Sequence, residues 1–166
     1  MNLVNSLAVV IGIMGGLATW VALTTTGTLN LQIWAIFIAW ACFYHCGGGM
    51  DGLKSGLIGN IWGLIMATIA LTLVGSVGGS VGGASVVVGV TVLILILGAN
   101  VGMLSSIPAG VYGYAAGAAF GLMTTADAGV FTLTGNGLLL PMALSMVVGA
   151  VLGLISEKIA GSLASG

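Results

Sequence analysis

The stretch WACFYHCGGGMDGLKSGLIGNIWG, residues 40–63, decides how this chain can fold. It contains the only histidine, His45, and both cysteines, Cys42 and Cys46. Long apolar segments with almost no ionisable residue lie on both sides of it. The three consecutive glycines at 47–49 break a helix, because glycine adopts turn conformations without steric cost. The stretch therefore predicts the end of one membrane helix, a tight turn and the start of the next helix.

The composition of the chain predicts that it lies in a lipid bilayer. Of its 166 residues, 59% are hydrophobic and 3% are charged, whereas a soluble domain carries about 25% charged residues. The apolar runs are continuous and lack the alternation of membrane β-strands, so the backbone polar groups must pair within helices. The absence of arginine and the net charge of −1 argue against a nucleic-acid partner. We expect one all-α transmembrane domain over residues 1–166, without a cleaved signal peptide.

Six apolar segments are long enough, or nearly so, to cross a hydrocarbon core that takes about 20 helical residues. The expected helices are 3–24, 31–46, 52–74, 85–104, 108–123 and 138–159. The fifth segment is short, so it either spans the membrane completely or enters it as a half-helix. With six spans, Lys54 and Lys158 lie on the same side as the N-terminus. The positive-inside tendency then places both termini in the cytoplasm.

Glycines spaced four residues apart predict close packing between helices. Gly113, Gly117 and Gly121 form a triplet on the fifth segment, and pairs with this spacing occur on other segments. Such a row leaves a flat groove that another backbone can approach closely. A break followed by a glycine-spaced helix occurs in both 43–63 and 105–121, which is a weak sign of an internal repeat. Two unrelated glycine-rich turns are the preferred interpretation.

Cys42, His45 and Cys46 share one helix face, because their spacings are three and four residues. Two thiols and an imidazole could bind a soft metal ion. A closed zinc site needs four ligands, however, and no carboxylate lies within the next few residues. Packed thiols beside a hydrogen-bonded histidine are the preferred interpretation. We therefore expect neither a metal ion nor a cofactor.

Few side chains are suited to line a polar path across the membrane. His45 can change its charge near neutral pH, and its position near a helix end fits a functional or a structural role equally well. Asn60 and Asn100 are amides within apolar segments, so each needs a polar partner there. Trp40 and Trp62 could narrow such a path. The candidate pore-lining or substrate-binding residues are Trp40, His45, Asn60, Trp62, Asn100, Ser105, Ser106 and Tyr112.

The sequence contains no recognisable catalytic constellation. Asp51, Asp127 and Glu157 all fall at expected helix ends or in loops, so no acid pair lies within a membrane segment. The chain also lacks an HExxH motif and a serine, histidine and aspartate at compatible depths. We therefore do not expect an enzyme.

Four motifs carry a resemblance to a known family. They are GIMGGLATWVAL (12–23), WAIFIAWACFYHCGG followed by GLKSGL (34–57), SSIPAGVYGYAAGAAFG (105–121) and LPMALSMVVGAVLGLI (140–155). In this order they resemble the small bacterial inner-membrane proteins grouped as domain of unknown function 1097, over nearly the whole chain. Family members have a proline-containing CPQGG-like turn where this chain has HCGGG at 45–49. The resemblance implies an inner-membrane protein, and it assigns no chemistry and no family-wide role to His45.

Together these features favour a passive channel or facilitator for a small uncharged polar solute of the urea/amide, ammonia or water class. Such a solute needs only amides, hydroxyls and a narrow aromatic constriction. We expect the lipid bilayer, the solute and further copies of the chain in a homo-oligomer as partners. One alternative is a proton-coupled transporter that uses His45 with Asp51 or Asp127. The other is a structural membrane subunit that transports nothing.

Overall fold

A computed structural model describes residues 1–25, 29–124 and 137–164. All of the elements in this part of the chain are helical, which confirms the predicted fold class. They are α1 (Leu3–Thr24), α2 (Ile33–His45), α3 (Gly49–Ser76), α4 (Val81–Leu97), the 3₁₀ turns η1 (Gly98–Asn100) and η2 (Gly102–Leu104), α5 (Ile107–Met123) and α6 (Leu139–Ala164). The expected polar connection with Asp127 and Asn136 lies outside the described residues.

Four of these helices are long and apolar enough to cross a membrane: α1, α3, α4 continued by η1, and α6. The remaining two, α2 and α5, are shorter apolar helices of 13 and 17 residues. The fifth helix is short, as the sequence predicts, and the second is shorter still. At a rise of about 1.5 Å per residue, α2 covers about 20 Å of a hydrocarbon core that is about 30 Å thick. The expected helix start at Leu31 is wrong, since Gln32 is still extended.

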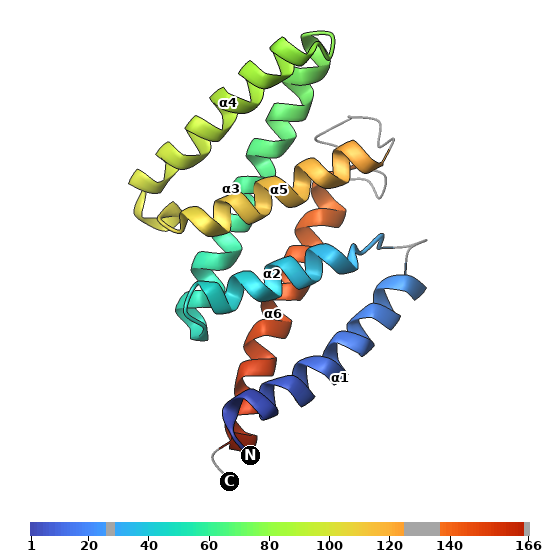
Figure 1. Ribbon diagram of the computed structural model, residues 1–166, viewed down its shortest axis with the longest axis vertical. Helices are drawn as coiled ribbons and strands as arrows, with labels where there is room; N and C mark the ends of the chain where they lie inside the picture. The colour runs from blue at the N-terminus through green and yellow to red at the C-terminus, as the bar shows by residue number, and fades with distance from the viewer. Residues whose placement is uncertain (26–28, 125–136, 165–166) are drawn as a thin grey trace.

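The helices form two halves, α1–α3 and α4–α6, which an approximate two-fold rotation about the view direction of Figure 1 superimposes on each other. In both halves, the long last helix packs against the short helix of the other half, α3 against α5 and α6 against α2. The first helix of each half packs on the last helix of the other, α1 on α6 and α4 on α3. Because each half contains three helices, this rotation gives the halves opposite orientations in the membrane.

Glycine positions in the sequence follow the same symmetry. Gly59 and Gly63 are the eleventh and fifteenth residues of α3, and Gly149 and Gly153 hold the same places in α6. A Cβ atom on Gly63 would overlap the carbonyl of Gly110 in α5. In the other half, a Cβ atom on Gly149 would overlap a carbonyl of α2, that of Ile36. Both long helices thus use a glycine pair to approach the backbone of a short helix.

The repeat differs from the pairing that the sequence suggests between 43–63 and 105–121. In the structure α3 corresponds to α6, while α5 corresponds to α2. The glycine triplet of α5 resembles the glycines of α3 for another reason, which is that the two helices pack against each other. Gly113 lies against the backbone of Asn60, and Gly117 lies against Leu64.

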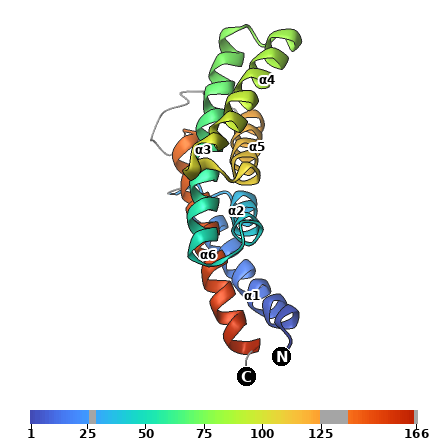
Figure 2. The ribbon, with the colours of Figure 1, turned by 90° about the vertical axis from the view of Figure 1, so that its left-hand side faces the viewer.

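The molecule is a thin, elongated layer of helices when it is turned by 90° (Figure 2). Both termini lie at one end of it, and the turn between α3 and α4 lies at the other (Figure 1). The amino group of Met1 donates a hydrogen bond to the carbonyl of Leu163 at 3.4 Å. The two described chain ends therefore lie on the same side, which agrees with an even number of crossings.

Candidate functional site

The three-glycine turn places the ends of α2 and α3 in direct contact. Gly47, Gly48 and Gly49 have φ angles of 95°, 71° and 60°, a left-handed region that glycine adopts without strain. The N–H groups of Gly47 and Gly48 donate to the last carbonyls of α2, at 3.0 and 3.1 Å. Gly52 is the fourth residue of α3, and a Cβ atom on it would lie 3.0 Å from the carbonyl oxygen of Phe43. The turn thus lays the first turns of α3 against the last turns of α2.

This contact brings a row of thiol, hydroxyl and amide side chains together beside a glycine. We call these residues the polar column: Cys42, Cys46, Gly56, Asn60 and Ser106. The sulfur atoms of Cys42 and Cys46 are 3.9 Å apart, and Cys46 Sγ is 3.3 Å from the hydroxyl of Ser106. A Cβ atom on Gly56 would lie 3.6 and 3.7 Å from the two sulfur atoms. The column therefore lies where α2, the start of α5 and one face of α3 meet.

His45 and Tyr112 lie at the outer end of the polar column. Nδ1 of His45 and the hydroxyl of Tyr112 are 2.8 Å apart and share a hydrogen bond, and the two rings meet edge to face at 61°. His45 is exposed, whereas Cys42 is fully buried. Among the described residues, no group of three or more His, Cys, Asp or Glu side chains is placed to hold a metal ion.

Asn60 lies at the inner end of the polar column. Its side chain is fully buried, and neither Oδ1 nor Nδ2 makes a hydrogen bond of ordinary geometry with any described residue, so the thiol of Cys42 is at most a weak partner. The amide lies beside the thiol of Cys42, one helical turn from Gly56. Leaving a buried polar group unpaired costs about 1–3 kcal/mol, and native structures retain few such groups. An amide with a free donor and a free acceptor at the end of a polar file is suited to bind a neutral polar solute.

The other predicted site residues lie away from the polar column. Trp40 is buried toward α6, and its Nε1 donates to the hydroxyl of Ser156 at 2.9 Å. Trp62 faces α4 and donates to the carbonyl of Leu95 at 3.2 Å. Asn100 is exposed and donates to its own helix end, and Ser105 is exposed beside Ser106. The two tryptophans therefore do not form the expected aromatic constriction, because their indole N–H groups have found partners on other helices.

Glu157 has a role in this region that the sequence does not reveal. Its Oε2 atom accepts a hydrogen bond from the N–H of Gly49 at 2.8 Å. Gly49 is the first residue of α3, and the N-cap residue Gly48 has no side chain that could cap the helix. A carboxylate at a helix N-terminus stabilises it by pairing a free N–H group and by opposing the helix dipole. The fixed turn beside the polar column is thus tied to α6.

Two apolar cavities lie outside the polar column. The first has a volume of about 280 Å³ between α1, α2 and α6, and the second has about 330 Å³ between α3, α4 and α5. Their linings include no residue of the column. The first is lined by Met14, Leu17, Ala18, Val21, Leu31, Ile36, Val148 and Leu152. Such surfaces suit lipid chains rather than a polar solute.

The fold and the column define an all-helical membrane protein built from an inverted repeat of three helices, with one polar file ending at a buried amide. The chain belongs to the family described as "Protein of unknown function (DUF1097)", whose model matches residues 8–161. The resemblance noted in the sequence is thereby confirmed. Comparisons with curated proteins and with solved structures find no match.

Proposed function

We propose that the protein is a channel or facilitator for a small uncharged polar solute of the urea/amide, ammonia or water class. The observation that carries this proposal is the buried amide of Asn60, which makes no hydrogen bond of ordinary geometry within the described chain and has the weakly hydrogen-bonding thiol of Cys42 beside it. A carboxamide offers two N–H donors and one carbonyl acceptor, so it can replace part of the water shell of a neutral solute. An ion would need a fixed charge or a ring of carbonyls to replace its hydration.

The remaining groups of the polar column support the same proposal. The hydroxyl of Ser106 and the two thiols lie between the exposed end at His45 and the amide of Asn60. Gly56 adds no side chain at the level of the sulfur atoms, which leaves space beside them. A solute that enters beside His45 and Tyr112 would therefore pass weak donors and acceptors before it reaches the amide.

A proton-coupled transporter is the second candidate function, and the hydrogen bond between His45 and Tyr112 favours it. This pair lies at the outer end of the polar column, where an imidazole could exchange a proton with water and with a passing solute. The two candidates predict different transport. With urea or formamide, which do not ionise near neutral pH, only a coupled transporter accumulates solute when a proton gradient is imposed on proteoliposomes.

Replacing Asn60 by leucine is expected to lower solute flux about tenfold, because the loss of one hydrogen bond to the solute costs about 1–3 kcal/mol. Folding should be retained, since the amide makes no hydrogen bond within the described chain. Stopped-flow measurement of urea, formamide, ammonia and water flux into proteoliposomes tests this expectation. The matched control is Asn100→Leu, which changes an exposed amide outside the column. Equal flux in the two variants would contradict the proposal. If the wild-type flux equals that of empty liposomes, the protein does not transport these solutes and the alternative of a structural subunit is favoured.

The proposal includes a homo-oligomer in the bacterial inner membrane with both termini in the cytoplasm. Lys54 lies in the first two turns of α3 and Lys158 in the last two turns of α6, so with six crossings both fall on the side of the termini, as the positive-inside tendency requires. Gly12 and Gly16 of α1 meet no other side chain or backbone within 4 Å, so this glycine pair remains available to a second copy.

Topology reporters fused after Gly79 and at the C-terminus are expected to report opposite sides of the membrane. The turn between α3 and α4 lies at the far end of the molecule from the termini (Figure 1). A reporter active only in the cytoplasm should be active at the C-terminus, and one active only in the periplasm should be active after Gly79. Two fusions that report the same side would rule out this topology.

A further inference from the structure

We propose that the apolar cluster of Leu64, Ala116, Phe120, Leu138, Met142 and Met146, called here the apolar plug, closes the polar column and sets what passes through the protein. This inference rests on the proposed function, and it adds the residues that form the barrier. The plug is part of the main hydrophobic core, and each of its residues is at most 4% exposed.

The plug begins one helical turn beyond the polar column. Gly52, Gly56, Asn60 and Leu64 follow one another at four-residue intervals on one face of α3, so the face changes from small to polar and then to apolar. On α5, Gly113 lies against the backbone of Asn60, and Ala116 and Phe120 follow on the next turns. The column therefore runs directly into the plug.

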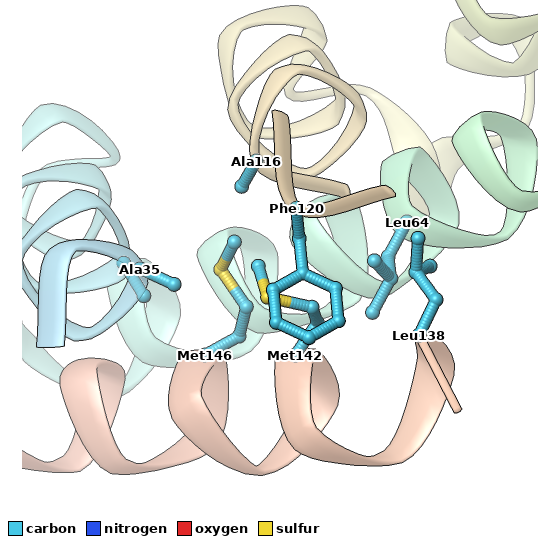
Figure 3. Packing of buried hydrophobic residues seen from close by; sticks show 8 residues of the cluster. Ala35, Leu64, Ala116, Phe120, Leu138, Met142 and Met146 are labelled. Atoms are coloured by element: carbon cyan, nitrogen blue, oxygen red, sulfur yellow. The ribbon is translucent and has the colours of Figure 1, made fainter. Parts of the chain in front are cut away.

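Side chains from α6 complete the plug (Figure 3). Phe120 points from α5 toward Met142, with Leu64 and Leu138 beside it, and Met146 lies between Ala35 and Ala116. Met142 and Met146 are fully buried.

The internal symmetry shows that the plug fills the place that the polar column occupies in the other half. The fourth and eighth residues of α3 are Gly52 and Gly56, whereas those of α6 are Met142 and Met146. The short helices differ in the same way. The tenth and fourteenth residues counted from the start of α2 are Cys42 and Cys46, whereas the tenth and fourteenth residues of α5 are Ala116 and Phe120. The same four places thus hold glycines and thiols in one half and mostly bulky apolar side chains in the other.

This asymmetry has a direct consequence for transport. An apolar constriction excludes ions because they find nothing there that replaces their hydration. Methionine side chains are flexible, so rotamer changes of Met142 and Met146 can admit a small neutral solute without moving a helix. The plug would then limit the rate of solute flux and keep ions out.

The two cysteines are natural reporters for a test, because they are the only thiols of the chain and lie on the column side of the plug. In oriented proteoliposomes, a small membrane-impermeant methanethiosulfonate reagent is added to one face at a time. Wild-type protein should react from the face that carries the α2–α3 turn, and at least tenfold more slowly from the opposite face. In the double variant Met142→Ala, Met146→Ala, reaction from the opposite face should increase at least tenfold, together with solute flux and ion leak.

The matched control is Met66→Ala, which removes the same atoms from a methionine that is 3% exposed and lies outside the plug. It should leave both labelling and flux unchanged. If the double variant does not fold, Phe120→Leu removes the aromatic ring from the plug while retaining an apolar side chain. The folded state of each variant is verified by size-exclusion chromatography before labelling.

The outcomes separate the two proposals. Labelling of wild type at equal rates from both faces would overturn the plug, as would an unchanged rate in every folded plug variant. If Asn60→Leu lowers flux while the plug variants behave like wild type, the proposed function stands and the plug is wrong. If the plug variants open the thiols to the opposite face but no protein conducts any solute, the plug stands and the proposed function fails.

Discussion

Replacing Gly63 or Gly149 by alanine is expected to lower the thermal midpoint of the detergent-solubilised protein by about 5 °C or more. A single Cβ atom at either place would overlap a carbonyl of the facing short helix, Gly110 in one half and Ile36 in the other. Overpacking of this kind costs about 1–3 kcal/mol, and each kcal/mol shifts the midpoint of a chain of this size by about 2–4 °C. The obstacle is backbone, which cannot move aside as the end of a side chain can.

The control for this experiment is alanine at Gly89 of α4, where a Cβ atom meets nothing within 4 Å. This change should leave the midpoint unchanged or raise it, since alanine favours a helix over glycine. Gly63 is the fifteenth residue of α3 and Gly149 is the eleventh residue of α6, so the two are not equivalent positions and each tests its own backbone contact. An unchanged midpoint in either variant would contradict the close approach of the helices at that glycine.

Gly48→Ala is expected to have the second large effect. At φ 71° and ψ −168° this residue lies in a region that is essentially restricted to glycine, and strain of this kind costs about 1–3 kcal/mol. A Cβ atom there would also overlap the carboxylate of Glu157. The change should therefore displace Glu157 from the N–H of Gly49 and leave the start of α3 without its partner. The yield of monodisperse protein and the thermal midpoint would both fall.

Two further variants separate the causes of that loss. Gly78→Ala places alanine at a positive φ angle of 71° in the α3–α4 turn, where a Cβ atom meets nothing within 4 Å. It reports the cost of a positive φ angle without the carboxylate contact. Glu157→Gln keeps an oxygen acceptor for Gly49 but removes the charge at the helix N-terminus, a change worth about 0.3–1 kcal/mol. If Gly48→Ala proves no worse than Gly78→Ala, the contact with Glu157 is not a significant part of its effect.

Composition and glycine breaks are sufficient to predict the class, the number of helices and the bounds of α1. They do not predict the start of α2, because no glycine or proline separates the apolar Leu31 from Ile33, while the backbone of Gln32 is still extended. The internal repeat is difficult to see in the sequence because the halves share few residue types. Gly59 and Gly63 of α3 correspond to Gly149 and Gly153 of α6. Gly52 and Gly56, however, correspond to two methionines at the same places in α6.

The proximity of His45, Asn60, Ser106 and Tyr112 follows from the order of the breaks, which bring the end of the second helix and the start of the fifth beside the third. The directions of Trp40 and Trp62 do not follow, since they depend on hydrogen bonds to α6 and α4. The apolar plug cannot be predicted from the sequence either. Its methionines come from α6, and only the packing of that helix against α2 and α3 brings them beside Phe120.

The hydrogen bond between Met1 and Leu163 makes the described chain almost a closed ring. A peptide joining the two ends would be short, and new ends could be made at the exposed Gly78–Gly79 turn. Such a circular permutant would be synthesised as α4–α6 followed by α1–α3, and every helix contact would remain available to it. The order in which the halves are translated is therefore a property of the gene and not a requirement of the folded protein.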